Sequence, residues 1–221
     1  MISRVFLFTS VLFMCLACRE QQDGTAGLSH STKTTTITLP DTVLNKLQDG
    51  DIILRQGDGP LSFHLSRSTG EIYTHCGIIY KSKTGKLNVI HTLGSDSSEK
   101  GINGVQTQSL ERFVQQSADS ILFICRPIFK DSVGKQIVSA ASTYLKAKIP
   151  FDYKFSLLTP EKFYCSELLY YVFKDVNDGK NVFDLTLKHK TYILLFSTFF
   201  RTENFKPIFL LKEHLPTKLN D

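Results

Sequence analysis

The segment "THCGIIYKSKTGKLNVIHTL", residues 74–93, constrains the fold more than any other part of this chain. Two runs rich in β-branched residues flank a short stretch of Lys, Ser, Thr and Gly, which is the pattern of a β-hairpin. If residues 82–84 close the hairpin, residues whose numbers sum to 166 face each other, and His75 pairs with His91. Directly opposed side chains point to the same face of a sheet, with Cβ atoms about 5 Å apart. The sequence therefore predicts two neighbouring imidazoles, with Cys76 on the opposite face.

The two histidines also allow a purely structural interpretation. His75 would then end a strand, and His91 would be a core histidine with satisfied hydrogen bonds. A change of register by one residue would also separate the rings, because neighbouring residues of a strand point to opposite faces.

A second constraint comes from "KFYCSELLYYVF", residues 162–173, in which a cysteine precedes an amphipathic helix. The unpaired N–H groups and the dipole at a helix start favour a thiolate at Cys165. The dipole contributes only about 0.3–1 kcal/mol, less than one pKa unit, so activation also needs a neighbouring imidazole. The sequence therefore predicts Cys165 as a nucleophile that acts with the two histidines. The alternative is a buried apolar cysteine, since free cysteines are among the most buried residues.

The other cysteines do not suggest a disulfide framework or a metal site. If residues 1–17 are removed and Cys18 is lipidated, Cys76, Cys125 and Cys165 remain. An odd number at wide spacing argues against paired disulfides, and there is no CxxC pair of the kind that zinc sites use. We expect Cys76 and Cys125 in the core, and no metal or organic cofactor.

The N-terminus has the form of an export signal. One Arg precedes an apolar run that ends in Ala17-Cys18, which resembles a bacterial lipobox, although Cys15 stands where such a motif usually carries Leu. We therefore predict a lipoprotein signal peptide over residues 1–17 with Cys18 as the lipidated residue. An ordinary signal cleaved elsewhere, or an uncleaved anchor, is the alternative. The lipid would attach the exported protein to a bacterial membrane, facing the periplasm or the cell exterior.

Residues 18–42 are polar and rich in Ser, Thr and Gly, which is typical of a flexible tether. Residues 43–221 are expected to form one domain, because a chain of 221 residues that is 42% hydrophobic can bury a single substantial core. The formal net charge is +5, and the basic residues are scattered, so nucleic-acid binding is not expected.

The remaining pattern favours an α+β class, an antiparallel sheet packed against helices. Strands are expected in "DIILR", "SILFICRP" and "KPIFLLKE". Helices are expected in "PLSFHLSRSTG", which ends at Gly70, in "DSVGKQIVSAASTYLKAK" with Asp131 as its cap, and from Tyr164 to about Val176. The apolar "YILLFSTFF" segment is too short to span a membrane and is expected in the core.

Several of these segments together resemble one family. The motifs are "GDIIL", "THCGIIY", "NVIHTLG", "IPFDYKF" and "FYCSELLYYVF", in this order over roughly residues 45–176. They resemble the YiiX/YebB-like hydrolases, circularly permuted, papain-like cysteine hydrolases of the NlpC superfamily. The resemblance implies a permuted papain-like (NlpC-type) fold in which the histidine strands precede the nucleophile helix. The segment from Asn177 to Phe205 lies beyond the clearest similarity and is a candidate substrate-selecting insertion.

The resemblance also implies roles for individual residues. Cys165 would be the nucleophile, His75 the general base, and His91 the third residue, where relatives often have a glutamate. Tyr164 would line the site or assist an oxyanion hole, and Asp51 would be structural or position the substrate. The implied reaction is hydrolysis of an amide bond through an acyl-enzyme, in a cell-wall peptide, an acyl-amide or an amidated small molecule. A lipid ester hydrolase or acyltransferase with the same triad, and a catalytically idle binding lipoprotein, are the alternatives.

Overall fold

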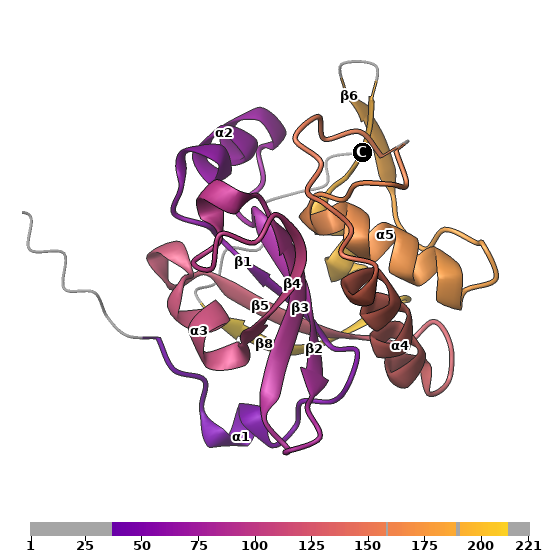
Figure 1. Cartoon of the computed structure of the whole chain (residues 1–221). Helices are drawn as coiled ribbons and strands as arrows, with labels where there is room; N and C mark the ends of the chain where they lie inside the picture. Colours follow the sequence, from indigo (N-terminus) through magenta and orange to yellow (C-terminus); the bar gives the residue numbers. More distant parts are fainter. Residues whose placement is uncertain (1–36, 158, 189–190, 212–221) are drawn as a thin grey trace, which may run out of the picture. The chain divides into compact units, whose positions relative to one another are not determined.

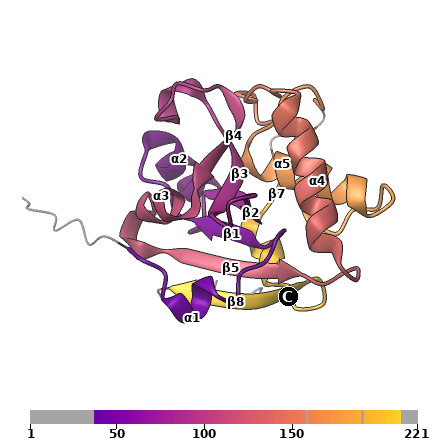
Figure 2. The ribbon, with the colours of Figure 1, turned by 60° about the horizontal axis from the view of Figure 1, so that its bottom comes forward.

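The computed structural model describes residues 37–157, 159–188 and 191–211. Its centre is a six-stranded sheet whose neighbouring strands are all antiparallel. Figure 1 and Figure 2 show the sheet from two sides. Across the sheet the strands are β4 (Gly104–Ser109), β3 (Leu87–Leu93), β2 (His75–Lys81), β1 (Ile52–Arg55), β5 (Leu122–Pro127) and β8 (Phe205–Leu211).

Helices cover both faces of the sheet. The long helices α4 (Val133–Lys146) and α5 (Cys165–Val176) pack on one face, in a core cluster with Leu54, Ile78 and Phe123. The short helices α1 (Asp41–Leu44) and α3 (Leu110–Gln115) belong to the cluster on the other face. In both views α4 and α5 lie across the sheet from α3 (Figure 1, Figure 2). The α+β class with an antiparallel sheet is therefore confirmed.

The central strand β1 explains why "IIL" is a continuous apolar run. Ile52 and Leu54 point into the cluster beneath α4 and α5, while Ile53 points into the opposite cluster. A strand covered on both faces needs apolar residues at every position rather than at alternate ones. The last residue of β1, Arg55, is also buried.

The hairpin of β2 and β3 exists, but its predicted register was wrong by two residues. The observed partners, such as Ile79 with Val89, have numbers that sum to 168, because the turn spans residues 82–86. In this register His91 lies opposite Gly77, and His75 is its diagonal neighbour. A shift of two residues preserves the side to which each side chain points, so both histidines still share a face.

The predicted helix ends are largely confirmed. The helix α2 (Pro60–Thr69) ends at Gly70, whose φ of 79° is the left-handed conformation that glycine tolerates. Ser132 rather than Asp131 occupies the N-cap position of α4, without a capping hydrogen bond from its side chain, so the predicted cap was wrong by one residue. Short 3₁₀ turns η1 (Ser95–Ser97) and η2 (Ala118–Ser120) connect other elements.

The packed domain begins before the boundary expected from composition. Ile37 is buried, and Leu39 packs against the same cluster as Val43 and Leu47. Residues 37–42, which the sequence assigned to the tether, therefore contribute to the core. The predicted signal peptide and the rest of the tether lie outside the described residues.

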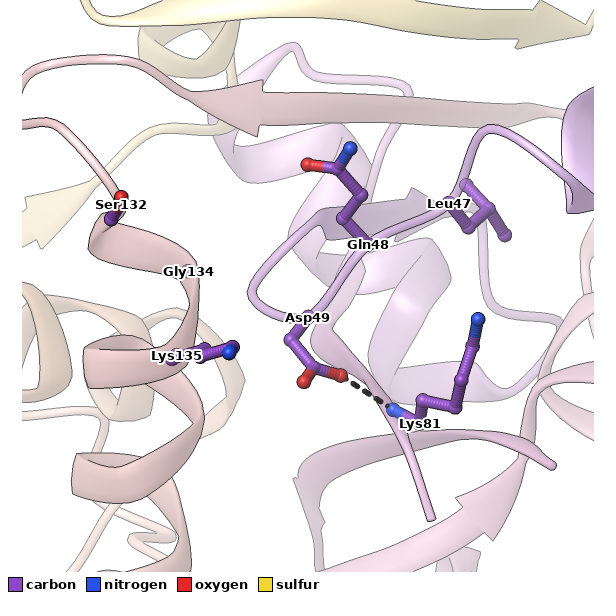
Figure 3. Close-up of a pocket in the computed structure, with 7 residues that line it drawn as sticks. All are labelled: Leu47, Gln48, Asp49, Lys81, Ser132, Gly134 and Lys135. Carbon is purple, nitrogen blue, oxygen red and sulfur yellow. Dashed lines mark hydrogen bonds between the residues drawn. The ribbon is translucent and has the colours of Figure 1, made fainter. Parts of the chain in front are cut away.

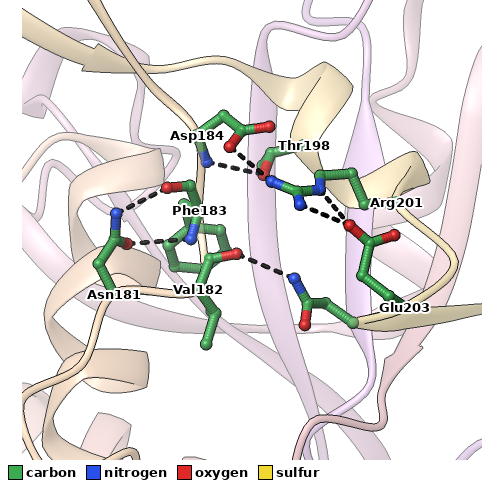
Figure 4. Close-up of polar contacts among 8 residues, drawn as sticks. Asn181, Val182, Phe183, Asp184, Thr198, Arg201 and Glu203 are labelled. Atoms are coloured by element: carbon green, nitrogen blue, oxygen red, sulfur yellow. Dashed lines mark hydrogen bonds and ion pairs between the residues drawn. The ribbon is translucent and has the colours of Figure 1, made fainter.

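The segment after α5 forms a small structure that is separate from the main sheet. It contains a hairpin of β6 (Leu185–Lys188) and β7 (Thr191–Leu194), followed by the 3₁₀ helix η3 (Phe196–Phe200). Arg201 joins its two ends through ion pairs of 2.5 Å to Asp184 and to Glu203 (Figure 4). Phe199 is fully buried, so the expectation that "YILLFSTFF" contributes to the core is confirmed for η3. Among the described residues, no helix is both long and apolar enough to cross a bilayer.

Candidate active site

A cavity of about 500 Å³ opens where α2, the start of β2 and the start of α5 meet. Its size is typical of pockets that bind small organic ligands. Among the residues that line it are Arg55, Asp58, Leu61, Leu65, Thr74, His75, Thr92, Glu99, Arg112, Phe151, Phe155 and Cys165. The cavity thus brings together Cys165 and His75, two of the three residues of the predicted triad.

The start of α5 is fixed by backbone and side-chain contacts. The Tyr164 N–H donates a hydrogen bond of 3.2 Å to the Glu167 carboxylate, which satisfies one donor at the helix start. The Thr92 hydroxyl donates to the Phe163 carbonyl at 2.9 Å. Phe163 also forms a β-bridge with Phe151, in the "IPFDYKF" segment. These contacts hold Cys165 against the ends of β2 and β3.

The Cys165 thiol lies against the first residues of β2. Its Sγ is 3.8 Å from the Thr74 carbonyl oxygen, and the side chain is 9% exposed. A hydrogen bond with the Cys76 thiol lowers the pKa of Cys165; burial opposes this, and backbone N–H groups, among them that of Ser166, lower the pKa further. Burial and the same neighbour raise the pKa of Cys76. Of the two thiols, Cys165 is therefore the one that ionises more easily.

The two histidines are in direct contact. His75 Nε2 and His91 Nδ1 are 3.1 Å apart, and both rings pack against Phe113 of α3, each with its centroid 5.4 Å from that ring. The neighbouring Gly77 cannot carry a side chain, because a Cβ there would lie 2.3 Å from the Val89 Cγ1 and 3.2 Å from the Cβ of His91. With Nε2 of His75 engaged by His91, its Nδ1 is the nitrogen left for another partner. Among the described residues, no hydrogen bond joins the Cys165 thiol to either imidazole, so Cys165 and His75 share the cavity wall without touching.

Both imidazoles are held neutral. Burial, then Arg55, then His91 lower the pKa of His75 well below 6.5. Burial and Arg55 lower the pKa of His91 to about 3. Neutral imidazoles can accept a proton, which is what a general base requires. His91 also lines a small polar cavity of about 30 Å³, large enough for one water molecule.

Arg55 is a site residue that the sequence did not predict. It lies opposite His75 in the sheet, is 5% exposed and lines the same cavity as Cys165. Its guanidinium carbon lies 4.8 Å from the centroid of the Phe113 ring. The signal in the sequence was a charged residue that ends an otherwise apolar strand, "IILR".

The remaining predicted residues are not brought into this cavity. Asp51 is fully buried at the other end of β1 and forms two hydrogen bonds with Arg126, of 2.7 and 2.8 Å. The Tyr164 hydroxyl is buried without a hydrogen-bond partner, in a cluster with Phe151 and Leu157. Both positions suit structural roles. Cys125 is buried in the core, as expected.

A second cavity, of about 440 Å³, contains none of the predicted site residues. It is lined by Leu47, Gln48, Asp49, Lys81, Ser132, Gly134 and Lys135 (Figure 3). The Lys81 backbone N–H donates to the Asp49 carboxylate there, at 2.7 Å. Without a nucleophile or a buried base, this cavity is not a candidate catalytic centre. In the described part of the chain, no group of three or more His, Cys, Asp or Glu side chains is placed to hold a metal ion.

A family model described as "Permuted papain-like amidase enzyme, YaeF/YiiX, C92 family" matches residues 46–192, more than half of the chain. The chain belongs to this family of permuted papain-like amidases. Membership confirms the predicted resemblance and shows a cysteine hydrolase of the amidase type. The family match includes Arg55, both histidines and Cys165.

Comparison with solved structures supports the same fold. The crystal structure of "metalloprotein yiiX" from Escherichia coli O157:H7 superimposes with a TM-score of 0.60 at 18% sequence identity. The alignment covers 74% of this chain and 97% of that one. This likeness confirms the permuted papain-like fold. Among curated proteins, none matches the chain.

Proposed function

We propose that this amidase uses Cys165 as its nucleophile, His75 as the general base and His91 as the residue that orients His75. The observation that carries the proposal is the shared cavity of Cys165 and His75, together with the 3.1 Å contact between His75 Nε2 and His91 Nδ1. In the productive tautomer, the Nε2–H of His75 donates to His91 Nδ1, which leaves the lone pair of His75 Nδ1 to take the proton of the Cys165 thiol.

The reaction then follows from these roles. His75 takes the proton of the Cys165 thiol, and the thiolate attacks the carbonyl carbon of the amide to form a tetrahedral oxyanion. As the oxyanion collapses, the C–N bond breaks, and the amine leaves with the proton from His75. A water molecule, deprotonated by His75, attacks the thioester and releases the carboxylic acid and the free thiol.

The start of α5 is suited to stabilise the oxyanion. Backbone N–H groups at a helix start are unpaired and carry partial positive charge, and the group that begins α5 includes Cys165 and Ser166. We assign no part of this task to the Tyr164 hydroxyl, because it does not line the cavity.

An amide substrate is favoured over a lipid ester. The argument for a lipid substrate was the apolar segment over residues 192–200, yet none of its residues lines the cavity, and Phe196 and Phe199 are buried in the core. The cavity wall combines apolar side chains with charged ones such as Arg55 and Asp58. A polar amide, such as a peptide or an acyl-amide, suits this lining better than an acyl chain.

We further propose that the enzyme is exported and attached to a bacterial membrane through a lipid on Cys18. The support is the sequence over residues 1–18, an apolar run that ends in Ala-Cys. The hydrolase domain would then act on substrates in the cell envelope.

The nucleophile is tested with a thiol-reactive acyl-amide probe and a panel of peptides and acyl-amides. Wild type should be labelled at Cys165 and should hydrolyse part of the panel, whereas Cys165→Ala should do neither. Cys125→Ala is the matched control, since Cys125 is equally a free cysteine but lies in the core. Labelling of Cys165→Ala at Cys76, or equal turnover by wild type and Cys165→Ala, would refute the assignment.

A further inference from the structure

Arg55 carries a buried positive charge that the triad does not use. Its Nη1 donates to the backbone carbonyl of Gln116, while its Nε is buried and has no hydrogen-bond partner. A guanidinium has five N–H donors, so one bond to a carbonyl leaves most of its capacity unused. Taking such a cation out of water is costly unless it is paired.

No carboxylate in the described part of the chain pairs with this cation. Among the residues that the structure describes, none has a carboxylate oxygen within 4.0 Å of an Arg55 nitrogen. Glu99, on the wall of the same cavity, is engaged by Arg112 at 2.7 Å and by the Gln116 amide at 3.0 Å. Asp58 is the acidic residue with the largest influence on Arg55, and it is exposed at the cavity rim.

The position of Arg55 links it to the reacting groups. It lies opposite His75 in the sheet and shares the cavity with Cys165. Burial lowers the pKa of Arg55 to about 10, and the neighbouring Asp58 and Cys165 raise it, so the guanidinium stays charged at neutral pH. The cavity therefore presents a fixed, poorly solvated cation beside the nucleophile.

We propose that Arg55 binds an oxyanion group of the substrate, a carboxylate or a phosphate, inside the cavity that Cys165 lines. This assignment rests on the proposed role of Cys165, and it narrows the substrate to amides that carry a negative charge. The planar fork of a guanidinium matches the oxygens of either group, and a hydrogen bond to a charged partner is stronger than one between neutral groups.

Alkylation of Cys165 tests the proposal without a known substrate. The thiolate attacks the iodinated carbon of iodoacetate or of iodoacetamide, a C–S bond forms and iodide leaves. The two reagents are similar in size, but only iodoacetate carries a carboxylate. Peptide mass spectrometry measures the rate of alkylation at Cys165 with each reagent. We expect the rate with iodoacetate divided by the rate with iodoacetamide to fall about tenfold in Arg55→Gln. This change corresponds to the loss of one charge-assisted hydrogen bond.

Three variants make the result specific. Arg55→Lys keeps the charge and should retain part of the ratio, and Arg55→Met, which is close in volume, should behave like Arg55→Gln. Arg67→Gln removes an exposed arginine of α2 outside the cavity and should keep the wild-type ratio. Loss of Arg55 also raises the pKa of His75. Burial still lowers the pKa of His75 in this variant, and any imidazolium that forms would favour the anionic reagent, so a fall in the ratio must come from the lost guanidinium.

The outcomes separate this proposal from the catalytic one. An unchanged ratio in Arg55→Gln, with rapid alkylation of Cys165, overturns the role of Arg55 alone. Alkylation of Cys165 no faster than of Cys76 or Cys125 overturns the proposed nucleophile, whatever the ratio. A matched set of amides with a carboxylate, a phosphate or an uncharged group then identifies the oxyanion. Equal kcat/KM for all three would also overturn the proposal.

Discussion

His75 is buried among cationic and aromatic neighbours, and yet it must accept a proton in the proposed mechanism. The groups that face it are Arg55 from β1, His91 from β3 and the Phe113 ring from α3. Burial is the largest of the effects that lower its pKa well below 6.5, followed by Arg55 and then His91. The imidazole is therefore ready as a base over a wider acid range than a solvated histidine.

This environment predicts the pH dependence of the reaction. A general base is active only when it is unprotonated, so the acid limb of kcat/KM should lie below the ordinary histidine pKa of about 6.5. We expect kcat/KM for an activated amide to stay nearly constant from about pH 8 down to about pH 6. A profile measured on wild type, with Cys165→Ala as the blank, checks this. Loss of half the activity near pH 6.5 would contradict a neutral, buried His75.

Glu167 is another buried ionisable group, and its burial affects the stability of the fold. Burial raises the pKa of Glu167 from 4.5 to about 8, although its hydrogen bond from the Tyr164 N–H lowers it. Between those two values the folded state keeps the proton that the unfolded state has released. Stability must therefore fall as the pH rises through this window.

We expect Glu167→Gln to remove this penalty, because the amide is never charged and still offers an oxygen to the Tyr164 N–H. The midpoint of thermal unfolding should rise by about 2–4 °C near pH 8.5 and change little near pH 4. Calorimetry at both pH values measures the effect. The exposed Glu161→Gln serves as the control and should show no such pH dependence. Equal shifts at the two pH values would refute the explanation by charge.

At the level of elements, the β2–β3 hairpin sets the geometry of the histidines. Directly opposed side chains would have put the two rings in register, whereas the observed register makes His75 and His91 diagonal neighbours across Gly77. The missing side chain of Gly77 leaves space for the Val89 side chain, the Ile90 carbonyl and His91. Glycine in a strand costs conformational entropy, and here the close approach of neighbouring groups explains its presence.

Gly77→Ala should therefore disturb both the core and the site. The added Cβ would lie 2.3 Å from the Val89 Cγ1, 3.0 Å from the Ile90 carbonyl oxygen and 3.2 Å from the His91 Cβ, so β3 must shift and His91 moves with it. We expect kcat/KM per folded molecule to fall by about 10–100-fold, since small displacements of catalytic groups have effects of this size. The matched control is Gly85→Ala in the hairpin turn, where φ is +81° and no atom lies within 4 Å. It should lower stability without changing kcat/KM, and equal kinetic effects would contradict the role of Gly77.

The β2–β3 hairpin also shows which features of the site the sequence pattern could predict. Alternation along the strands correctly put both histidines on one face and Cys76 on the other, because a strand has a period of two. The register depended on the turn over residues 82–86, whose length the pattern did not determine. The pairing of Cys76 with Cys165, and the burial of Arg55 against Phe113, depend on contacts between distant segments. No local pattern carries that information.

Across the whole molecule, the proposed site residues come from segments that are far apart in sequence. Arg55, His75 and His91 belong to the sheet, and Cys165 belongs to a helix that follows it in the chain. The described residues from Asn177 to Phe205 do not line the catalytic cavity. Their aromatic side chains, such as Phe183 and Phe199, extend the core instead, which argues against the substrate-selecting role that the sequence suggested.

The last prediction concerns how the protein is held in the cell. If Cys18 is lipidated, wild-type protein should incorporate labelled palmitate in growing bacteria and should have Cys18 as its first residue after cleavage. Cys18→Ser should lose the label, because serine has no thiol to form the thioether. Cys15→Ser, which changes only a residue of the signal, should keep it. Because burying acyl chains contributes about 0.8 kcal/mol per CH₂, the wild type should stay with membranes until detergent is added. Label that persists in Cys18→Ser would show that the lipid is attached at another residue. Wild-type protein without label would contradict the predicted lipidation.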